Sequence, residues 1–238
     1  MKRFGEYFVR MIGAIAFVVP LASALPAAAE TVEVAPGVQV TKRSYKAPVN
    51  EQPFFGFAAR NAEDKAADEK FVSAIVAAAG TRGKAFEEIT NRAWRALNTG
   101  KIREAPVRFN QAFLLSPQES SVYHGFAVVA QFRFNDFDAA DELFKIALKQ
   151  PDPVKALRAD YGRMLLIAKR PRDAEPVLEQ AVKDAPDFGD AWTNLAVARF
   201  QNGNAPAACT AVEEALKRRP SNNSGQDLIV VKNAAQCK

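Results

Sequence analysis

The 238-residue sequence contains few of the side chains that carry most enzyme chemistry. It has a single histidine, His124, and only two cysteines, Cys209 and Cys237. A metal site built on several histidines, a histidine-assisted nucleophile and a CxxC redox motif therefore lack the necessary residues. The twelve glycines form no phosphate-binding loop. These absences predict a protein that is not an enzyme and that has no metal site and no cofactor.

A long hydrophobic run occurs only near the N-terminus. Met11–Leu25 is mainly apolar, basic residues precede it, and Ala27–Ala29 supplies the small residues of a cleavage site. This pattern predicts a signal peptide over residues 1–29 that is cleaved after Ala29. The alternative, an uncleaved membrane anchor, requires a run of about 20 residues, and Pro20 would break it. We therefore expect a bacterial protein that is periplasmic or secreted and is not stably inserted in a membrane.

Positive charge is not concentrated anywhere in the sequence. Cleavage at the predicted site removes three basic residues and one acidic residue, which lowers the formal net charge from +5 to +3. The densest basic run is Lys217–Arg219. Because nucleic-acid binding relies on clustered lysine and arginine, nucleic acid is not an expected partner.

A repeated pattern dominates the second half of the sequence. An alanine is followed by a large apolar residue four positions on, a second alanine three further on, and then a proline. The copies are Ala105, Phe109, Ala112 and Pro117; Ala140, Phe144, Ala147 and Pro151; Ala174, Leu178, Ala181 and Pro186; and Ala208, Val212, Ala215 and Pro220. Positions i, i+4 and i+7 share one helix face, and proline ends the helix. The pattern therefore predicts four helices spaced about 34 residues apart.

A second amphipathic helix precedes most of these helices. Its markers are Tyr123, Phe126 and Ala127; Tyr161, Gly162 and Leu165; and Trp192, Leu195 and Ala196. Each unit is therefore predicted to be a pair of antiparallel helices. Neither helix of such a pair can bury its apolar face alone, so stacking of the units is required for a stable core.

These residues resemble the tetratricopeptide repeat family, whose 34-residue unit carries the pattern W-x2-L-G…A-x3-F…A…P. The resemblance covers residues 86–222 as four units, about 86–119, 120–153, 154–188 and 189–222. Arg92 and Arg158 stand where the pattern has a leucine and an aromatic residue. The resemblance implies an all-α array of helical hairpins that forms a right-handed superhelix with end-capping helices.

Both ends of the array have a predicted capping helix. At the N-terminal end, Asn61 begins a helix over residues 62–80 with an apolar stripe, and Gly80 ends it. At the C-terminal end, Ser224 and Asp227 are predicted to cap a helix over residues 223–238. The stripes are Phe71, Ile75 and Ala78 in the first helix, and Leu228, Val231 and Ala235 in the second.

Residues 30–61 are predicted to be an extended, partly flexible segment, because prolines and polar residues are frequent in them. Within this segment, Phe54, Phe55 and Phe57 make it too aromatic for a simple linker. The three rings either plug the first repeat, or dock in the groove of the array or on a partner.

The two cysteines are expected to form a disulfide. Cys209 lies about nine residues before the end of its helix, and Cys237 about thirteen residues along the antiparallel capping helix, which gives heights of roughly 14 and 19 Å. An oxidising compartment favours the bond. The alternative is two unpaired cysteines.

The family resemblance also implies binding, because the first helices of its units line a concave groove. The groove positions in this sequence are Asn91, Trp94, His124, Val128, Asp160, Arg163, Asn194 and Val197. Asn91 and Asn194 have side-chain amides that suit a peptide backbone. As alternatives, Trp94 packs on the end helix and Asn194 bonds within its own helix. We expect His124 to be a partly exposed groove residue and not a metal ligand.

The resulting functional hypothesis is a scaffold that binds a protein or an extended peptide in this groove. Envelope assembly, secretion or pilus machinery, and cell-wall coordination are compatible processes. The alternative is a carrier that holds an apolar small molecule or a lipid against the phenylalanine-rich N-terminal segment.

Overall fold

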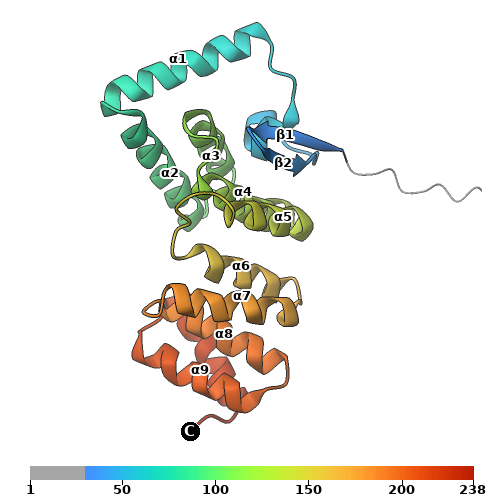
Figure 1. The fold of residues 1–238 in the computed structure, drawn as a ribbon, viewed down its shortest axis with the longest axis vertical. Coiled ribbons are helices and arrows are strands. Elements are labelled where there is room, and N and C mark those ends of the chain that lie inside the picture. Colours follow the sequence, from blue (N-terminus) through green and yellow to red (C-terminus); the bar gives the residue numbers. More distant parts are fainter. Residues whose placement is uncertain (1–29) are drawn as a thin grey trace, which may run out of the picture.

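The computed structural model describes residues 30–238 as a long stack of helices with a small β-hairpin at one side (Figure 1). The predicted signal peptide lies outside the described residues. The helices are α1 (Ala62–Ala79), α2 (Arg82–Asn98), α3 (Glu104–Leu115), α4 (Ser120–Phe134), α5 (Phe137–Ala147), α6 (Leu157–Ile167), α7 (Pro171–Asp184), α8 (Gly189–Gln201), α9 (Ala205–Lys217) and α10 (Asn222–Ala234). No helix in this part of the chain has the length and hydrophobicity of a membrane span.

The helices pair as four successive hairpins: α2 with α3, α4 with α5, α6 with α7, and α8 with α9. The predicted all-α array of helical hairpins is confirmed. The first hairpin begins at Arg82, a few residues before the expected boundary. After the last hairpin, α10 packs alone against α8 and α9.

Small residues let neighbouring helices approach closely, both within a hairpin and between successive hairpins. Ala105, Phe109 and Ala112 of α3 are fully buried, as the repeated pattern requires. The ring of Phe109 lies directly over Gly125 of α4, where an added Cβ would come within 2.1 Å of its Cε1 atom. Gly162 meets Leu178 in the same way. The large residue of the pattern therefore fills the space that a glycine leaves on the facing helix.

The N-terminal segment is folded, in contrast to the extended segment expected from the sequence. Strands β1 (Thr31–Ala35) and β2 (Val38–Thr41) form an antiparallel hairpin whose turn contains Gly37 at a φ of 74°. Alternating valines on both sides of a Pro-Gly pair are a hairpin signal. The prolines around this signal led to the prediction of an extended segment instead.

Two short 3-10 turns follow the hairpin, η1 (Val49–Glu51) and η2 (Pro53–Phe57). We call residues 45–57 the strap, because they run across α3, α4 and α5. The ring of Phe54 is buried, with centroids 4.6 Å from Phe126 and 5.5 Å from Phe113. This phenylalanine therefore packs on the first two hairpins.

One buried side chain fixes the backbone of the strap. The carboxamide of Asn110 accepts a hydrogen bond from the Phe55 N–H at 3.2 Å and donates to the carbonyl oxygens of Gln52, at 2.8 Å, and Asn50, at 3.1 Å. The residues from Phe54 to Phe57 all have a positive φ, which is a left-handed backbone conformation that residues other than glycine rarely adopt. The contacts to α3 hold the chain in this conformation.

The two end helices differ in how firmly they are held. In α1, Asn61 begins the helix and Gly80 ends it at a φ of 83°, as expected, and Asn61 also forms a reciprocal cap with Asp64, but no residue of α1 is buried. In α10, the predicted Ser224–Asp227 cap is wrong. The helix already begins at Asn222, so both residues lie inside it, where Ser224 is buried.

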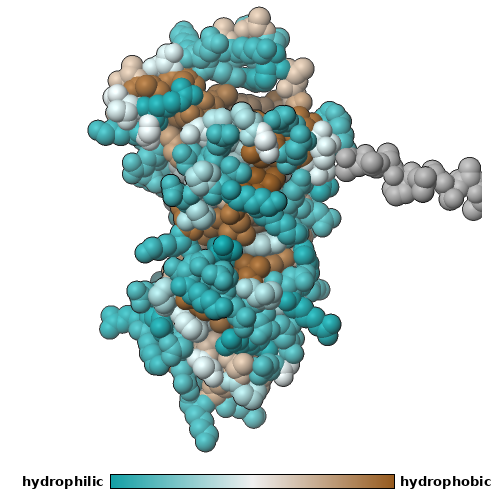
Figure 2. Space-filling view, viewed as in Figure 1, coloured by the Kyte–Doolittle hydropathy of each residue, from teal (hydrophilic) through white to brown (hydrophobic). Residues whose placement is uncertain are grey.

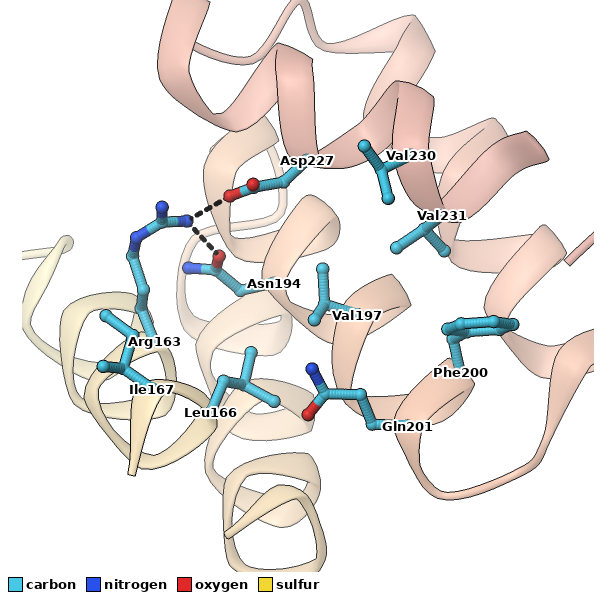
Figure 3. Close-up of a pocket in the computed structure, with 10 residues that line it drawn as sticks. All are labelled: Arg163, Leu166, Ile167, Asn194, Val197, Phe200, Gln201, Asp227, Val230 and Val231. Carbon is cyan, nitrogen blue, oxygen red and sulfur yellow. Dashed lines mark hydrogen bonds and ion pairs between the residues drawn. The ribbon is translucent and has the colours of Figure 1, made fainter. Parts of the chain in front are cut away.

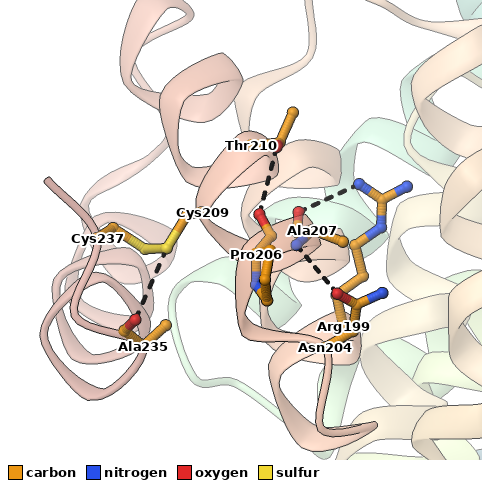
Figure 4. Close-up of a disulfide and its surroundings, with 8 residues drawn as sticks. All are labelled: Arg199, Asn204, Pro206, Ala207, Cys209, Thr210, Ala235 and Cys237. Carbon is orange, nitrogen blue, oxygen red and sulfur yellow. Dashed lines mark hydrogen bonds between the residues drawn. A yellow bond between two sulfur atoms is a disulfide. The ribbon is translucent and has the colours of Figure 1, made fainter.

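A disulfide joins α10 to the last hairpin. Cys209 of α9 and Cys237, just after α10, have Cα atoms 5.2 Å apart and are covalently linked (Figure 4). The estimated heights of the two residues along their helices differed by about one helical turn. The chain after α10 closes this gap, because it turns back at Gln236, which has a φ of 55°.

Candidate functional site

Five of the eight predicted groove residues form a row across the first helices of the hairpins: Trp94, His124, Asp160, Arg163 and Asn194. The ring of Trp94 on α2 lies 4.7 Å from that of His124 on α4, measured between centroids. The Nε2 atom of His124 lies 2.9 Å from a carboxylate oxygen of Asp160 on α6. One turn further along α6, Arg163 donates to Asn194 on α8 at 3.3 Å. The row therefore joins successive repeats, because its members bond to one another.

His124 is buried, and our expectation of a partly exposed groove residue is wrong. Only 1% of its surface is accessible, because almost all of α4 between Val122 and Gln131 is covered by the neighbouring helices and the strap. Its Nδ1 atom has no hydrogen-bond partner in the described part of the chain. His124 therefore connects α4 to α6 and is not available to a ligand from solution.

Asn194 and Trp94 also contact neighbouring repeats. Asn194 is 3% exposed, and its Nδ2 atom donates to the carbonyl oxygen of Ala159 at 3.2 Å. Its amide thus bonds to the backbone of α6. It neither bonds within its own helix α8 nor remains free for a peptide. The ring of Trp94 packs edge-on against Phe109 and does not rest on α1 alone. Of the remaining predicted residues, Asn91 is exposed and Val128 is buried.

The C-terminal part of the row opens into a cavity of about 410 Å³ between α6, α8 and α10 (Figure 3). Its apolar lining consists of Leu166, Ile167, Val197, Phe200, Val230 and Val231, and its polar lining of Arg163, Asn194, Gln201 and Asp227. Three of the eight predicted groove residues, Arg163, Asn194 and Val197, lie here. We call this site the C-terminal cavity.

The sequence analysis missed the other lining residues for two reasons. On α6 and α8 they lie three or four positions from a predicted residue, on the same helix face, so helical periodicity would have identified them. On α10, Asp227 was assigned to a cap and Val231 to a covering stripe, and Val230 was given no role. No pattern in the sequence indicated that this helix forms a wall of the cavity.

The polar edge of the C-terminal cavity is an ion pair. Arg163 donates to a carboxylate oxygen of Asp227 at 2.7 Å, and the two side chains are 37% and 41% exposed. Such a half-exposed pair contributes little to stability. Ile167 and Val230 are 44% and 66% exposed at the same place. The cavity therefore combines an electrically neutral polar edge with apolar surface that the chain itself leaves uncovered.

The carboxyl group of Asp141 lies at the junction of α5 with α6 and α7. Burial raises the pKa of Asp141, but hydrogen bonds from Lys145 and Tyr161 and the charge of Arg170 outweigh this effect, so its pKa is lower than usual. Burial and the bond to Asp141 raise the pKa of Tyr161. These shifts belong to the contact between repeats and not to the C-terminal cavity.

Comparison with known proteins gives a consistent picture. Residues 168–223 match the family model of the tetratricopeptide repeat. PilF of Pseudomonas aeruginosa is 22% identical with a TM-score of 0.57, covering 65% of this chain and 71% of its own. MamA from Desulfovibrio magneticus RS-1 is 20% identical with a TM-score of 0.50, covering 63% and 85%. Cut9–Hcn1 of the APC/C is 19% identical with a TM-score of 0.54, covering 70% and 34%. No curated protein sequence matches.

These likenesses show a shared fold. Residues 168–223, over α7 to α9, match the tetratricopeptide repeat, and the four stacked hairpins have the fold of tetratricopeptide-repeat arrays. Proteins of this class are interaction scaffolds.

Proposed function

We propose that the protein binds an extended segment of another protein in the C-terminal cavity. The observation that carries this proposal is the hollow of about 410 Å³, with an apolar floor and a few polar groups at its edge. Binding sites for small groups and side chains commonly have this composition. Exposed Ile167 and Val230 give the partner apolar surface to cover.

The lining indicates the chemistry of the segment. A large apolar side chain would fill the space between Leu166, Val197 and Phe200. The carboxamide of Gln201 lies at the edge of the cavity between Leu166 and Phe200, apart from Arg163 (Figure 3). Both groups suit the peptide groups on either side of such a side chain, since a carboxamide both donates and accepts hydrogen bonds.

Selection of peptides from a random display library tests the proposal. We expect Val197→Trp, which fills the cavity, to weaken binding of the selected peptides at least tenfold. The matched control is Ile229→Trp, because Ile229 is 62% exposed on α10 and does not line the cavity. Selected peptides that bind both variants and the parent equally would place the interaction elsewhere.

We also propose that the protein is exported and acts outside the cytoplasm. The tripartite pattern of residues 1–29 supports export, and a disulfide persists in an oxidising compartment. Envelope assembly, secretion or pilus machinery and cell-wall coordination are the processes in which such a scaffold would serve. N-terminal sequencing of the protein from its own cells is expected to begin at Glu30, and a retained Met1 would contradict cleavage.

A further inference from the structure

A second hollow lies at the opposite end of the molecule from the C-terminal cavity. It has a volume of about 450 Å³ and is enclosed by β1, the strap, the C-terminal end of α3 and the beginning of α1. Figure 1 shows α1 crossing above α3 from the hairpin to α2, and Figure 2 shows hydrophobic surface beneath its hydrophilic outer side. We call this hollow the N-terminal hollow.

Apolar side chains from three elements form the walls of the N-terminal hollow. They are Val32 and Val34 of β1, Phe55 and Phe57 of the strap, and Phe113 and Leu114 of α3. The two valines share one face of the strand because they are two positions apart. All six side chains are only half-buried. Helix α1 contributes only Asp68 to the lining, so it borders the hollow without filling it.

A cation with an unused hydrogen-bond donor lies at the edge of this apolar surface. The guanidinium of Arg60 lies 4.6 Å from the centre of the Phe55 ring and donates to a carboxylate oxygen of Asp68 at 2.7 Å. Its Nε atom is buried and has no hydrogen-bond partner among residues 30–238. Arg60 also lies 3.9 Å from a carboxylate oxygen of Asp64, and its side chain is 27% exposed. A guanidinium has five N–H donors, so Arg60 retains donors for a further carboxylate beside those of Asp68 and Asp64.

A second cation lies at another edge of the N-terminal hollow. Lys42 lies 3.1 Å from a carboxylate oxygen of Glu30, and both side chains are well exposed, at 42% and 66%. An exposed pair of this kind is weak and exchanges readily for another anion. Each cation at the rim thus has a carboxylate partner, and the hydrogen-bond donors that remain belong to Lys42 and Arg60.

The size of the hollow limits what it can hold. At roughly 30 Å³ for each heavy atom, the share of one water in the liquid, about 450 Å³ holds about fifteen heavy atoms. This is the size of one alkyl chain with a small head group. A diacyl phospholipid, which has two chains, does not fit.

We propose that the N-terminal hollow binds one free long-chain carboxylate. The alkyl chain lies against the valine and phenylalanine side chains, and the carboxylate accepts hydrogen bonds from Arg60. The site is separate from the C-terminal cavity and does not depend on peptide binding there. The proposal thereby assigns a site and a ligand class to the alternative function, that of a carrier for an apolar small molecule or lipid.

Isothermal titration calorimetry of the purified protein with dodecanoate tests the proposal, at concentrations below micelle formation. Dodecyltrimethylammonium has the same alkyl chain with a cationic head and is the matched ligand control. We expect dodecanoate to bind at one site, and Arg60→Gln to weaken its binding about tenfold without weakening that of the cationic ligand. Equal binding of both ligands, or an unchanged affinity in Arg60→Gln, would overturn the assignment.

Filling the hollow provides a second test that does not involve the head group. Leu114→Trp is expected to abolish dodecanoate binding. If this variant does not fold, Val34→Trp fills the same hollow from β1 and is expected to have the same effect. Val197→Trp, in the C-terminal cavity, is expected to bind dodecanoate like the parent protein. Loss of binding only in Val197→Trp would place the ligand in the C-terminal cavity and refute the proposal.

Discussion

At the scale of single residues, the junction between the second and third hairpins depends on one carboxylate. Asp141 accepts hydrogen bonds from the Tyr161 hydroxyl at 2.6 Å and from Lys145 at 2.8 Å, and it lies 3.4 Å from Arg170. Its side chain is 14% exposed. These contacts lower the pKa of Asp141 despite its burial, so the ionised form stabilises the folded state.

Replacing Asp141 by Asn is therefore expected to change how stability depends on pH. A carboxyl group whose pKa is lowered in the folded state contributes stability above its unfolded pKa of about 3.9, and this contribution is lost as pH falls below it. In Asp141→Asn the free energy of unfolding is expected to be lower at pH 7 and to fall less between pH 5 and pH 2. Urea denaturation across this range measures the difference.

The control for this experiment is Asp152→Asn. Asp152 is exposed and has a φ of 49°, a conformation that asparagine also tolerates. A stability profile of Asp141→Asn that matches those of this control and the parent would show that the carboxylate does not stabilise the junction.

At the scale of helices, close packing of the first hairpin on the second depends on the absence of a side chain at Gly125. Gly125→Ala places a Cβ within 2.1 Å of the buried Phe109 ring, which has no free space to move into. Overpacking of this kind costs about 1–3 kcal/mol. Gly225→Ala in α10 is the matched control, because nothing lies within 4 Å of its added Cβ.

The two substitutions are expected to act in opposite directions. In a helix interior alanine is favoured over glycine by about 0.5–1 kcal/mol, so Gly225→Ala raises the melting temperature while Gly125→Ala lowers it. Thermal melts followed by circular dichroism measure both. An equal rise in both variants would mean that α3 and α4 are farther apart than the structure shows.

The last helix depends on the disulfide. Only Ser224, Leu228 and Val231 of α10 are buried, and the Cys209–Cys237 bond spans 28 residues. A loop of this length contributes roughly 3–4 kcal/mol in the chain-entropy treatment. We expect the double variant Cys209→Ser, Cys237→Ser to lose stability of this order and to exchange amide hydrogens faster over residues 222–237.

Reduction of the disulfide provides the control for this prediction. With a dithiol present, the parent protein and the double serine variant are expected to unfold at the same urea concentration. If the parent protein still unfolds at a higher urea concentration than the variant after complete reduction, the disulfide is not the source of its greater stability.

At the scale of the whole molecule, the parts that repeat were predictable and the parts that do not repeat were not. A period of about 34 residues reports packing between neighbours in sequence, so it identified the hairpins and the helix faces between them. The N-terminal segment instead contacts residues far away in the sequence: the Thr41 N–H of β2 donates to Glu142, and the Tyr45 hydroxyl of the strap donates to Asp136. Contacts over such separations leave no periodic signal.

The difference between periodic and long-range contacts also explains which site residues were predicted correctly. Periodicity placed Arg163, Asn194 and Val197 on the correct helix faces, but it did not show that other helices cover His124. Burial of a given face depends on what packs over it, and here that includes the strap and α10. Both hollows therefore have a wall formed by an element outside the repeats.

The junction between α5 and α6 divides the molecule into two halves, each with one tryptophan. Across it, the Phe144 and Tyr161 rings stack at 5.2 Å and Tyr161 binds Asp141. Tyr161→Ala removes both contacts. We expect unfolding to separate into two steps, which single-tryptophan versions (Trp94→Phe or Trp192→Phe) report from either half. In the parent protein the two signals are expected to coincide, and coincident signals in Tyr161→Ala as well would show that the halves remain coupled.

The position of the disulfide also determines how the molecule would carry mechanical load. Tension applied at Lys238 would pass after a single residue through Cys237 to Cys209, and so into α9. Helix α10 lies within the closed loop and would stay slack, so the wall that it gives the C-terminal cavity would not be peeled away. Tension at the N-terminal side would instead load the hairpin and the strap directly. A partner that pulls on one end of the chain would thus disturb the two hollows unequally.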